Sequence, residues 1–124
     1  MKDGNVIQEK SYSFAIRIVN LYKFLCEQNK EYVLSKQLLC SGTSIGANIE
    51  EGIGGQSEMD FFAKLNIAYK EARETHYWLR LLRYTGYLSE SESKSMIDDC
   101  DDILKIIGSI IKTLKAKQNL ILNS

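Results

Sequence analysis

The sequence predicts an all-α protein, an up-down-up-down antiparallel four-helix bundle that forms a single domain over residues 1–124. Three observations favour this fold class. The chain contains no proline, so no position forbids a long helix. Apolar residues recur every three or four positions over four long segments, which is the spacing of a helix face that packs on a core. Short links separate the segments, and consecutive helices joined by short links pack antiparallel.

The first helix is predicted over about residues 6–28 and the second over about residues 36–52. The apolar stripe of the first helix consists of Phe14, Ile18, Leu21, Tyr22 and Leu25. Ser35 is the expected N-cap of the second helix, because a serine hydroxyl accepts a hydrogen bond from the free amides of a first turn.

The third helix is predicted over about residues 58–85, after a link that contains Gly52, Gly54 and Gly55. Ser57 and Asp60 form a weak capping box at its start. Its apolar stripe consists of Phe61, Leu65, Ala68, Ala72, Thr75, Leu79 and Leu82. Gly86 fits the left-handed position that follows a helix end.

The fourth helix is predicted over about residues 90–117. Ser89 and Glu92 match the capping box that opens many helices. Its apolar stripe consists of Ile97, Cys100, Leu104, Ile107, Ile111 and Leu114. The tail Leu120-Ile121-Leu122 either extends this helix or frays.

Small residues interrupt the apolar pattern of the second predicted helix between Ser41 and Gly52. A glycine inside a helix costs about 1 kcal/mol relative to alanine. Gly42 and Gly46 therefore indicate that the backbone needs space there, either for the close packing of another helix or for contact with a partner.

The charges sum to zero, with 16 basic and 16 acidic side chains. This balance argues against a protein that simply coats phosphates, which usually has a basic excess. The charges are nevertheless uneven: residues 90–102 carry six acids and one lysine, and residues 105–117 carry four lysines and no acid. An acidic start and a basic end suit the dipole of a helix, which is positive at the start and negative at the end. The alternative interpretation is that the basic end of the helix binds phosphate groups.

Cysteine usage and hydropathy predict a cytoplasmic protein. The three cysteines, Cys26, Cys40 and Cys100, are far apart and odd in number, so we expect reduced, buried thiols. The sequence has no apolar run long enough to span a membrane, and its start lacks the apolar stretch of a signal peptide.

The sequence offers no catalytic centre and no site for a metal or a cofactor. His76 is the only histidine, so no second histidine exists to complete a zinc site with it. The four carboxylates of residues 98–102 would splay around a helix and are expected to be solvated. No serine or cysteine has a plausible neighbouring base. We therefore predict a protein that is not an enzyme.

The third and fourth predicted helices carry more apolar surface than one core needs, which is typical of an interface between subunits. On the fourth helix this surplus consists of Ile103, Ile106 and Ile110. The candidate interface residues of the third helix are Tyr69, His76, Tyr77, Trp78 and Leu81. A wide core face is the alternative interpretation. Glu51 is expected to pair either with Lys64 or with an arginine of a neighbouring subunit.

One series of motifs resembles a known bacterial four-helix bundle family over about residues 5–115. The series is Ser44-Ile45-x-x-Asn48-Ile49-x-Glu51-Gly52, Ser57-x-x-x-Phe61, Leu65-x-Ile67-Ala68, Glu71-x-x-Glu74-Thr75, Leu79 and Gly86-Tyr87-Leu88. The family includes proteins encoded in the intervening sequences of large-subunit ribosomal RNA genes, and the accessory variability proteins of diversity-generating retroelements look like relatives. The residues assigned to close helix packing and to the family motif are Gly42, Gly46, Asn48, Glu51 and Gly52.

The resemblance implies a homo-oligomeric ring, expected to be a pentamer, and its retroelement relatives imply binding of RNA or DNA. The candidate nucleic-acid-binding residues are Lys64, Lys70, Arg73, Arg80, Arg83, Lys112 and Lys115. The predicted function is thus a non-enzymatic, oligomeric nucleic-acid-binding accessory protein linked to ribosomal RNA intervening sequences. The alternative is an oligomeric scaffold that binds only protein partners, and the zero net charge favours it.

Overall fold

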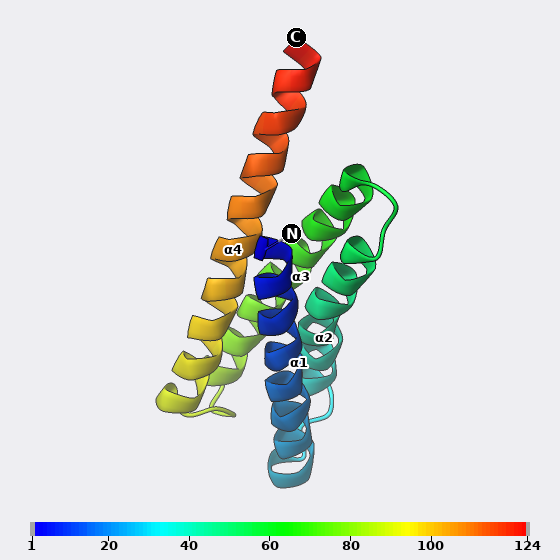
Figure 1. Cartoon of the computed structure of the whole chain (residues 1–124). Helices are drawn as coiled ribbons and strands as arrows, with labels where there is room; N and C mark the ends of the chain where they lie inside the picture. Colours follow the sequence, from blue (N-terminus) through cyan, green and yellow to red (C-terminus); the bar gives the residue numbers. More distant parts are fainter. Residues whose placement is uncertain (1, 124) are drawn as a thin grey trace.

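The computed structural model describes residues 2–123, with side chains from 5 to 122. Its four helices are α1 (Lys2–Asn29), α2 (Leu34–Ile53), α3 (Glu58–Tyr84) and α4 (Glu90–Asn123). Each helix packs antiparallel against the next, and α4 returns alongside α1 (Figure 1). No strand occurs in the part of the chain that the structure describes. The predicted all-α four-helix bundle is confirmed.

Buried side chains from all four helices form one core. The predicted stripes contribute Phe14, Ile18, Leu25, Phe61, Leu65, Ala68, Ala72, Leu79, Leu82, Cys100, Ile107 and Leu114. Ile103 and Ile110, predicted as surplus surface, are only 1% and 7% exposed, so that prediction was wrong. The reason is that α4 packs on α1 as well as on α3. Ile103 lies beside Phe14 and Ile110 beside Val6, both on α1.

The start of α2 differs from the prediction. The N-cap residue is Val33, whose side chain makes no capping hydrogen bond. The carboxylate of Glu31 instead accepts hydrogen bonds from the amides of Val33, Leu34 and Ser35, at 3.1, 2.9 and 2.7 Å. Ser35 is buried in the first turn, and its hydroxyl donates to the carbonyl oxygen of Glu31 at 2.7 Å. The prediction of Ser35 as N-cap was wrong because Glu31 already supplies the acceptors.

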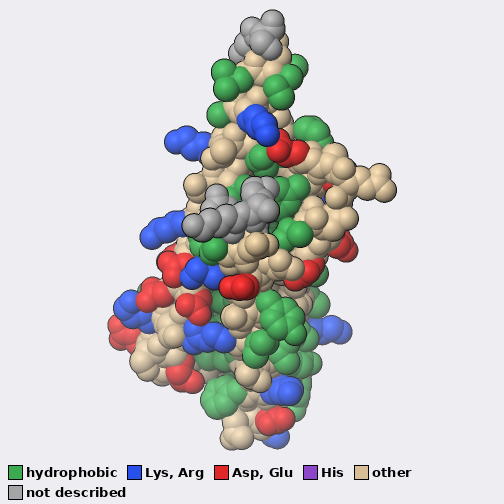
Figure 2. All heavy atoms as spheres, in the orientation of Figure 1, with side chains coloured by type: hydrophobic (Ala, Val, Ile, Leu, Met, Phe, Trp, Pro, Cys, Tyr) green, Lys and Arg blue, Asp and Glu red, His purple; other side chains and the backbone are tan. Residues whose placement is uncertain are grey.

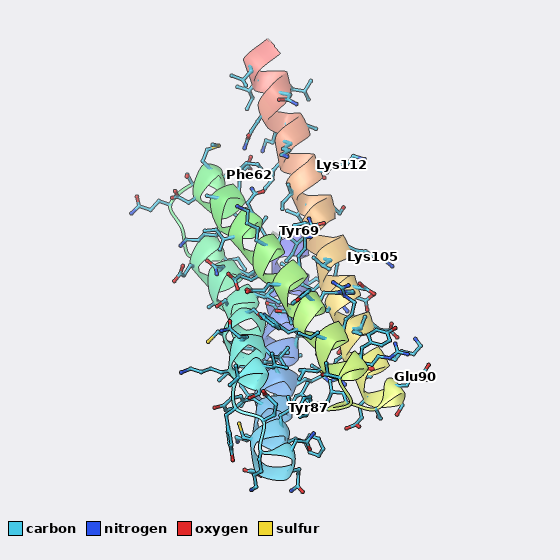
Figure 3. All side chains as sticks on the ribbon, turned by 180° about the vertical axis from the view of Figure 1, so that it is seen from behind. Phe62, Tyr69, Tyr87, Glu90, Lys105 and Lys112 are labelled. Atoms are coloured by element: carbon cyan, nitrogen blue, oxygen red, sulfur yellow. The ribbon has the colours of Figure 1, made fainter. Side chains whose placement is uncertain are left out.

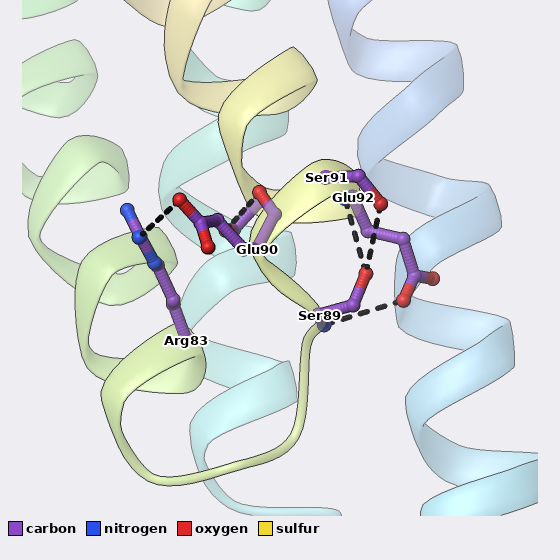
Figure 4. A network of polar contacts seen from close by, with 6 residues as sticks. Arg83, Ser89, Glu90, Ser91 and Glu92 are labelled. Atoms are coloured by element: carbon purple, nitrogen blue, oxygen red, sulfur yellow. Dashed lines mark hydrogen bonds and ion pairs between the residues drawn. The ribbon is translucent and has the colours of Figure 1, made fainter.

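The predicted capping box of α4 is confirmed, and that of α3 is confirmed in part. The Ser57 hydroxyl accepts from the Asp60 amide at 3.1 Å, but the Asp60 carboxylate accepts from the amide of Gln56, at 3.2 Å, and not from that of Ser57. At α4 the Ser89 hydroxyl accepts from the Glu92 amide at 3.2 Å, and the Glu92 carboxylate accepts from the Ser89 amide at 3.3 Å (Figure 4). Gly86, at φ +87°, ends α3 in the left-handed conformation that the sequence predicted.

The glycines of α2 lie against α1. A Cβ atom added at Gly42 would stand 2.7 Å from Cγ1 of Ile18, a fully buried side chain. A Cβ atom at Gly46 would stand 3.4 Å from the carbonyl oxygen of Ser11. The space predicted at these two positions is therefore used for close packing of α1 on α2.

Helix α4 continues beyond its predicted end at about residue 117 and is the longest of the four, with 34 residues. Its last turns project past the rest of the bundle (Figure 1). Lys117 still pairs with Glu58 of α3 at 3.0 Å, but Leu120 and Leu122 are 72% and 81% exposed. Figure 2 shows hydrophobic side chains gathered on this end. None of the described helices combines the length and apolar character needed to cross a membrane.

Candidate nucleic-acid interface

Basic and aromatic side chains alternate along the outer face of α3. Lys70, Arg73, Tyr77 and Arg80 are spaced by three or four residues, which places them on one side of a helix. Lys70, Arg73 and Arg80 are exposed, and the ring of Tyr77 is 49% exposed between the two arginines. We call these four residues the basic-aromatic strip. Tyr84, which is 76% exposed, continues the face at the end of α3.

The strip borders a cleft of about 560 Å³ between α3 and α4, to which α4 contributes Asp101 and Leu104. His76 lies in this cleft, and its Nε2 is 3.0 Å from Oδ1 of Asp101. Nε of Arg80 donates to Nδ1 of His76 at 3.0 Å, and the Arg80 guanidinium lies 5.8 Å from the centroid of the Tyr77 ring. Because neither partner of Arg80 is a carboxylate, its positive charge is oriented without being neutralised by an ion pair.

Ion pairing divides the basic residues predicted from the sequence into two groups. Lys64 pairs with Glu51 of α2 at 2.7 Å, as predicted, and Arg83 pairs with Glu90 of α4 at 3.3 Å (Figure 4). Within residues 5–122, no carboxylate forms an ion pair with Lys70, Arg73, Arg80, Lys112 or Lys115. The second group keeps its charge available to a ligand.

Two further exposed residues were missed as site candidates. Lys105 of α4 lines a hollow with Val6 of α1, and Lys112 lies two turns farther along the same side of α4 (Figure 3). The run of four lysines without an acid was the signal for Lys105. Tyr84 was missed because a tyrosine at a helix end has no distinctive spacing.

The five predicted interface residues do not lie in one patch. Tyr69 and His76 face α4: the Tyr69 ring is 3.7 Å from the position of a Cβ at Gly108, and His76 pairs with Asp101. Trp78 is two residues after His76, which places it about 200° around the helix. It is half-buried, its Nε1 has no hydrogen-bond partner among the described residues, and Tyr77 contacts it edge-on at 5.0 Å between centroids. Leu81 is also half-buried.

The family motif residues make their described contacts within the bundle. A Cβ at Gly52 would stand 3.1 Å from Cδ1 of Phe61 in α3, so this glycine lets α2 and α3 approach closely. The Asn48 side chain donates to the carbonyl oxygen of Ser44, one turn earlier, at 2.8 Å. Together with the Glu51–Lys64 pair, these contacts make the motif an architectural feature that joins α2 to its neighbours.

The acidic run on α4 holds structural contacts on several sides of the helix. Asp99 pairs with Arg17 of α1, Asp101 with His76 of α3, and Asp98 with Lys94 on α4 itself at 2.7 Å. The carboxylates thus point toward different partners, as expected for adjacent positions on a helix.

The three cysteines occupy different environments. Cys100 is buried, donates to the carbonyl oxygen of Ala72 at 3.2 Å, and has its pKa raised to about 12, first by burial and then by the nearby Asp101 and Asp99 carboxylates. Cys26 is only half-buried and Cys40 is exposed, so the prediction of three buried thiols was wrong for both. Cys40 lies on the outer surface of α2, where its small apolar side chain is not needed for the core.

Comparison with known proteins identifies the family. A model of the 23S rRNA-intervening sequence proteins matches residues 3–109. A solved structure from Bacteroides thetaiotaomicron, described as a protein of unknown function from the S23 ribosomal protein family, is 57% identical to this chain, with a TM-score of 0.86. The match covers 90% of this chain and 99% of that one. Comparison with curated proteins gave no match. The chain belongs to the family of 23S rRNA-intervening sequence proteins.

Proposed function

We propose that this protein is a non-enzymatic, oligomeric RNA-binding accessory protein, and that the basic-aromatic strip of α3 is its RNA contact. The expected RNA is a single-stranded loop of the ribosomal RNA intervening sequence after which the family is named. Exposed bases in loops stack on aromatic rings, whereas bases inside an RNA helix are difficult for side chains to reach.

The observation that carries this proposal is the exposed Tyr77 ring between two arginines that form no ion pair with a described carboxylate. Arginine and lysine supply affinity for the phosphate backbone, and a tyrosine ring supplies about 1–3 kcal/mol for each base stacked on it. This arrangement also explains why we assign Tyr77 to the RNA face and leave Trp78 and Leu81 as interface candidates.

A net charge of zero is compatible with such a face because many of the acids are engaged by basic partners or lie elsewhere, as Glu9 and Asp102 do in a hollow between α1 and α4. The acids that line the cleft beside the strip are Glu74 and Asp101. Oligomerisation, expected as a pentamer from the family resemblance, would present one strip per subunit. Several weak contacts to one RNA would then act together.

The test measures binding of a fluorescent loop RNA by anisotropy, at several salt concentrations. Replacing both Arg73 and Arg80 with Gln is expected to weaken binding and to reduce the slope of log K against log[salt] by about 1–2, since each lost phosphate contact removes about 0.7. Replacing Tyr77 with Ala is expected to weaken binding about 5- to 160-fold and to leave the slope unchanged, because stacking releases no counterions.

The matched control replaces Lys23 and Lys36 with Gln, two exposed lysines on α1 and α2 away from the strip. It removes the same charge as the double arginine variant and is expected to change the affinity much less. Equal losses in the two variants would mean that only total charge matters. A wild-type protein that ignores RNA at low salt would instead favour the protein scaffold.

A further inference from the structure

The seam between α1 and α4 is the least closely packed of the four helix contacts. Three hollows of about 340, 350 and 300 Å³ follow one another along it. We call this row the α1–α4 groove. Phe14, Ile103 and Ile106 are among the apolar residues that line it. The two outer hollows expose more apolar than polar surface, and each also carries one basic residue, Arg17 or Lys105, whereas polar side chains dominate the middle hollow. A groove between two helices with apolar sections is a geometry that accepts a third helix.

The rim of the groove is mainly acidic at its centre. Glu9, Asp99 and Asp102 line the middle hollow with a single lysine, Lys10. Asp99 is neutralised by Arg17, whereas Glu9 and Asp102 form no ion pair with any described basic side chain. A segment that combines apolar side chains with lysines would complement this groove.

The projecting end of α4 has that chemistry. Beyond Asp102 the helix carries four lysines and no carboxylate, and it ends in the exposed side chains of Leu120 and Leu122. Removing exposed leucine side chains from water is favourable, so these side chains favour a covered state. The end is part of one continuous helix that points away from its own bundle, so it cannot fold back into its own groove (Figure 1).

We propose that the end of α4 in one copy of this chain docks in the α1–α4 groove of a second copy. Leu120 and Leu122 lie in an apolar outer hollow of the groove, and Lys112 and Lys115 approach Glu9 and Asp102. The contact joins two different surfaces, so repetition closes a ring or continues as a filament. This inference rests on the oligomer in the proposed function and specifies how its subunits meet.

The test measures solution mass by light scattering over a range of protein concentrations, without RNA. The end variant carries Leu120→Asp and Leu122→Asp, and the groove variant carries Glu9→Lys and Asp102→Lys. All four positions are exposed, so both variants are expected to keep wild-type helicity by circular dichroism. Each variant alone is expected to be a monomer. A mixture is expected to give a 1:1 complex, because the intact groove of one accepts the intact end of the other.

The control is Val33→Asp, which adds a charge at another exposed apolar side chain, 72% exposed at the start of α2, and is expected to leave the mass unchanged. A monomeric wild-type protein, or an end variant with the wild-type mass, would overturn the docking proposal. RNA binding by the end variant is a separate readout, because a monomer retains its strip. The Arg73 and Arg80 variant is expected to lose RNA binding but to keep the wild-type mass, because its α4 end and its groove are unchanged. The docking contact is therefore tested separately from RNA binding.

Discussion

Glu31 illustrates how one carboxylate can begin a helix whose N-cap residue has no polar side chain. It is 8% exposed, yet it accepts three backbone hydrogen bonds from the first turn of α2. Burial by itself raises the pKa of Glu31, but the hydrogen bonds from the amides of Leu34, Ser35 and Val33 outweigh burial. The net pKa lies below its ordinary value of 4.5.

The lowered pKa links the stability of the protein to pH. A carboxyl group with a lower pKa in the folded than in the unfolded protein stabilises the fold above the unfolded pKa. That contribution is lost as the pH falls through the folded pKa. We therefore expect Glu31→Gln to lower the free energy of unfolding at pH 7 by about 1–2 kcal/mol, because one amide oxygen replaces a charged pair of acceptors.

Urea unfolding at pH 7 and pH 3 checks this prediction. The difference between wild type and Glu31→Gln is expected to shrink at the lower pH, where the wild-type carboxyl becomes protonated. Glu27→Gln, at an exposed position near the end of α1, is the control. An equal difference at both pH values would assign the role of Glu31 to packing alone.

Single residues differed in how far the sequence could predict them. The helix caps at Ser57 and Ser89 were predictable because each cap and its partner are three positions apart on one helix turn. Glu31 was not, since its position depends on Lys30 adopting the left-handed conformation at φ 53°. Ion pairing could not be predicted from the sequence either. The spacing of the basic residues does not distinguish Arg83, which pairs with Glu90, from Arg80, which forms no ion pair with a described carboxylate.

At the scale of helices, the contact between α1 and α2 depends on Gly42 more than on Gly46. An alanine at Gly42 would place its Cβ 2.7–2.9 Å from three atoms of the fully buried Ile18, which has no room to move. At Gly46 the nearest atom would be 3.4 Å away, close to ordinary contact. The two positions therefore make a matched pair with the same chemical change and different surroundings.

We expect Gly42→Ala to destabilise the protein by about 1–3 kcal/mol through overpacking. Gly46→Ala is expected to be neutral or to stabilise by up to about 1 kcal/mol, because alanine favours the helix and its methyl group fits. Thermal unfolding followed by circular dichroism measures both. Equal effects of the two substitutions would show that helix propensity, and not the space beside α1, decides their stability.

Helix existence and order followed from the apolar spacing, but both terminal helices are longer than predicted. The structure begins α1 at Lys2 and ends α4 at Asn123, where the sequence had placed these limits at about 6 and 117. In both places the amphipathic pattern stops before the helix does. In α4 the helix continues through Leu120 and Leu122, which are exposed, so periodicity alone underestimates such an end.

At the scale of the whole molecule, the candidate RNA face was only partly predictable. The sequence identified Lys70, Arg73 and Arg80, because they share one helix. It could not reveal that α4 places Asp101 and Leu104 in the cleft beside them, or that acids elsewhere neutralise Lys64 and Arg83. Net charge is a sum over the chain, and a sum of zero contains no information about which side of a bundle carries each sign.

The sparse packing between α1 and α4 also has a consequence for folding. The extensive contacts join helices that follow one another in the chain, and the α1–α4 contact, which joins distant segments, is the smallest. Bundles dominated by contacts between sequence neighbours have low contact order and fold within microseconds to milliseconds. We expect α1, α2 and α3 to associate first, so that this seam closes after the transition state.

Stopped-flow kinetics on two isoleucine variants tests this order. Ile45→Val in α2 and Ile103→Val at the seam each remove one methyl group from a buried side chain, at a cost of about 0.5–1.5 kcal/mol. Ile45→Val is expected to slow refolding, whereas Ile103→Val is expected to accelerate unfolding and leave refolding unchanged. Slower refolding of Ile103→Val would place closure of the seam before the transition state. With the seam closing last, a newly made chain holds three assembled helices before its fourth has docked.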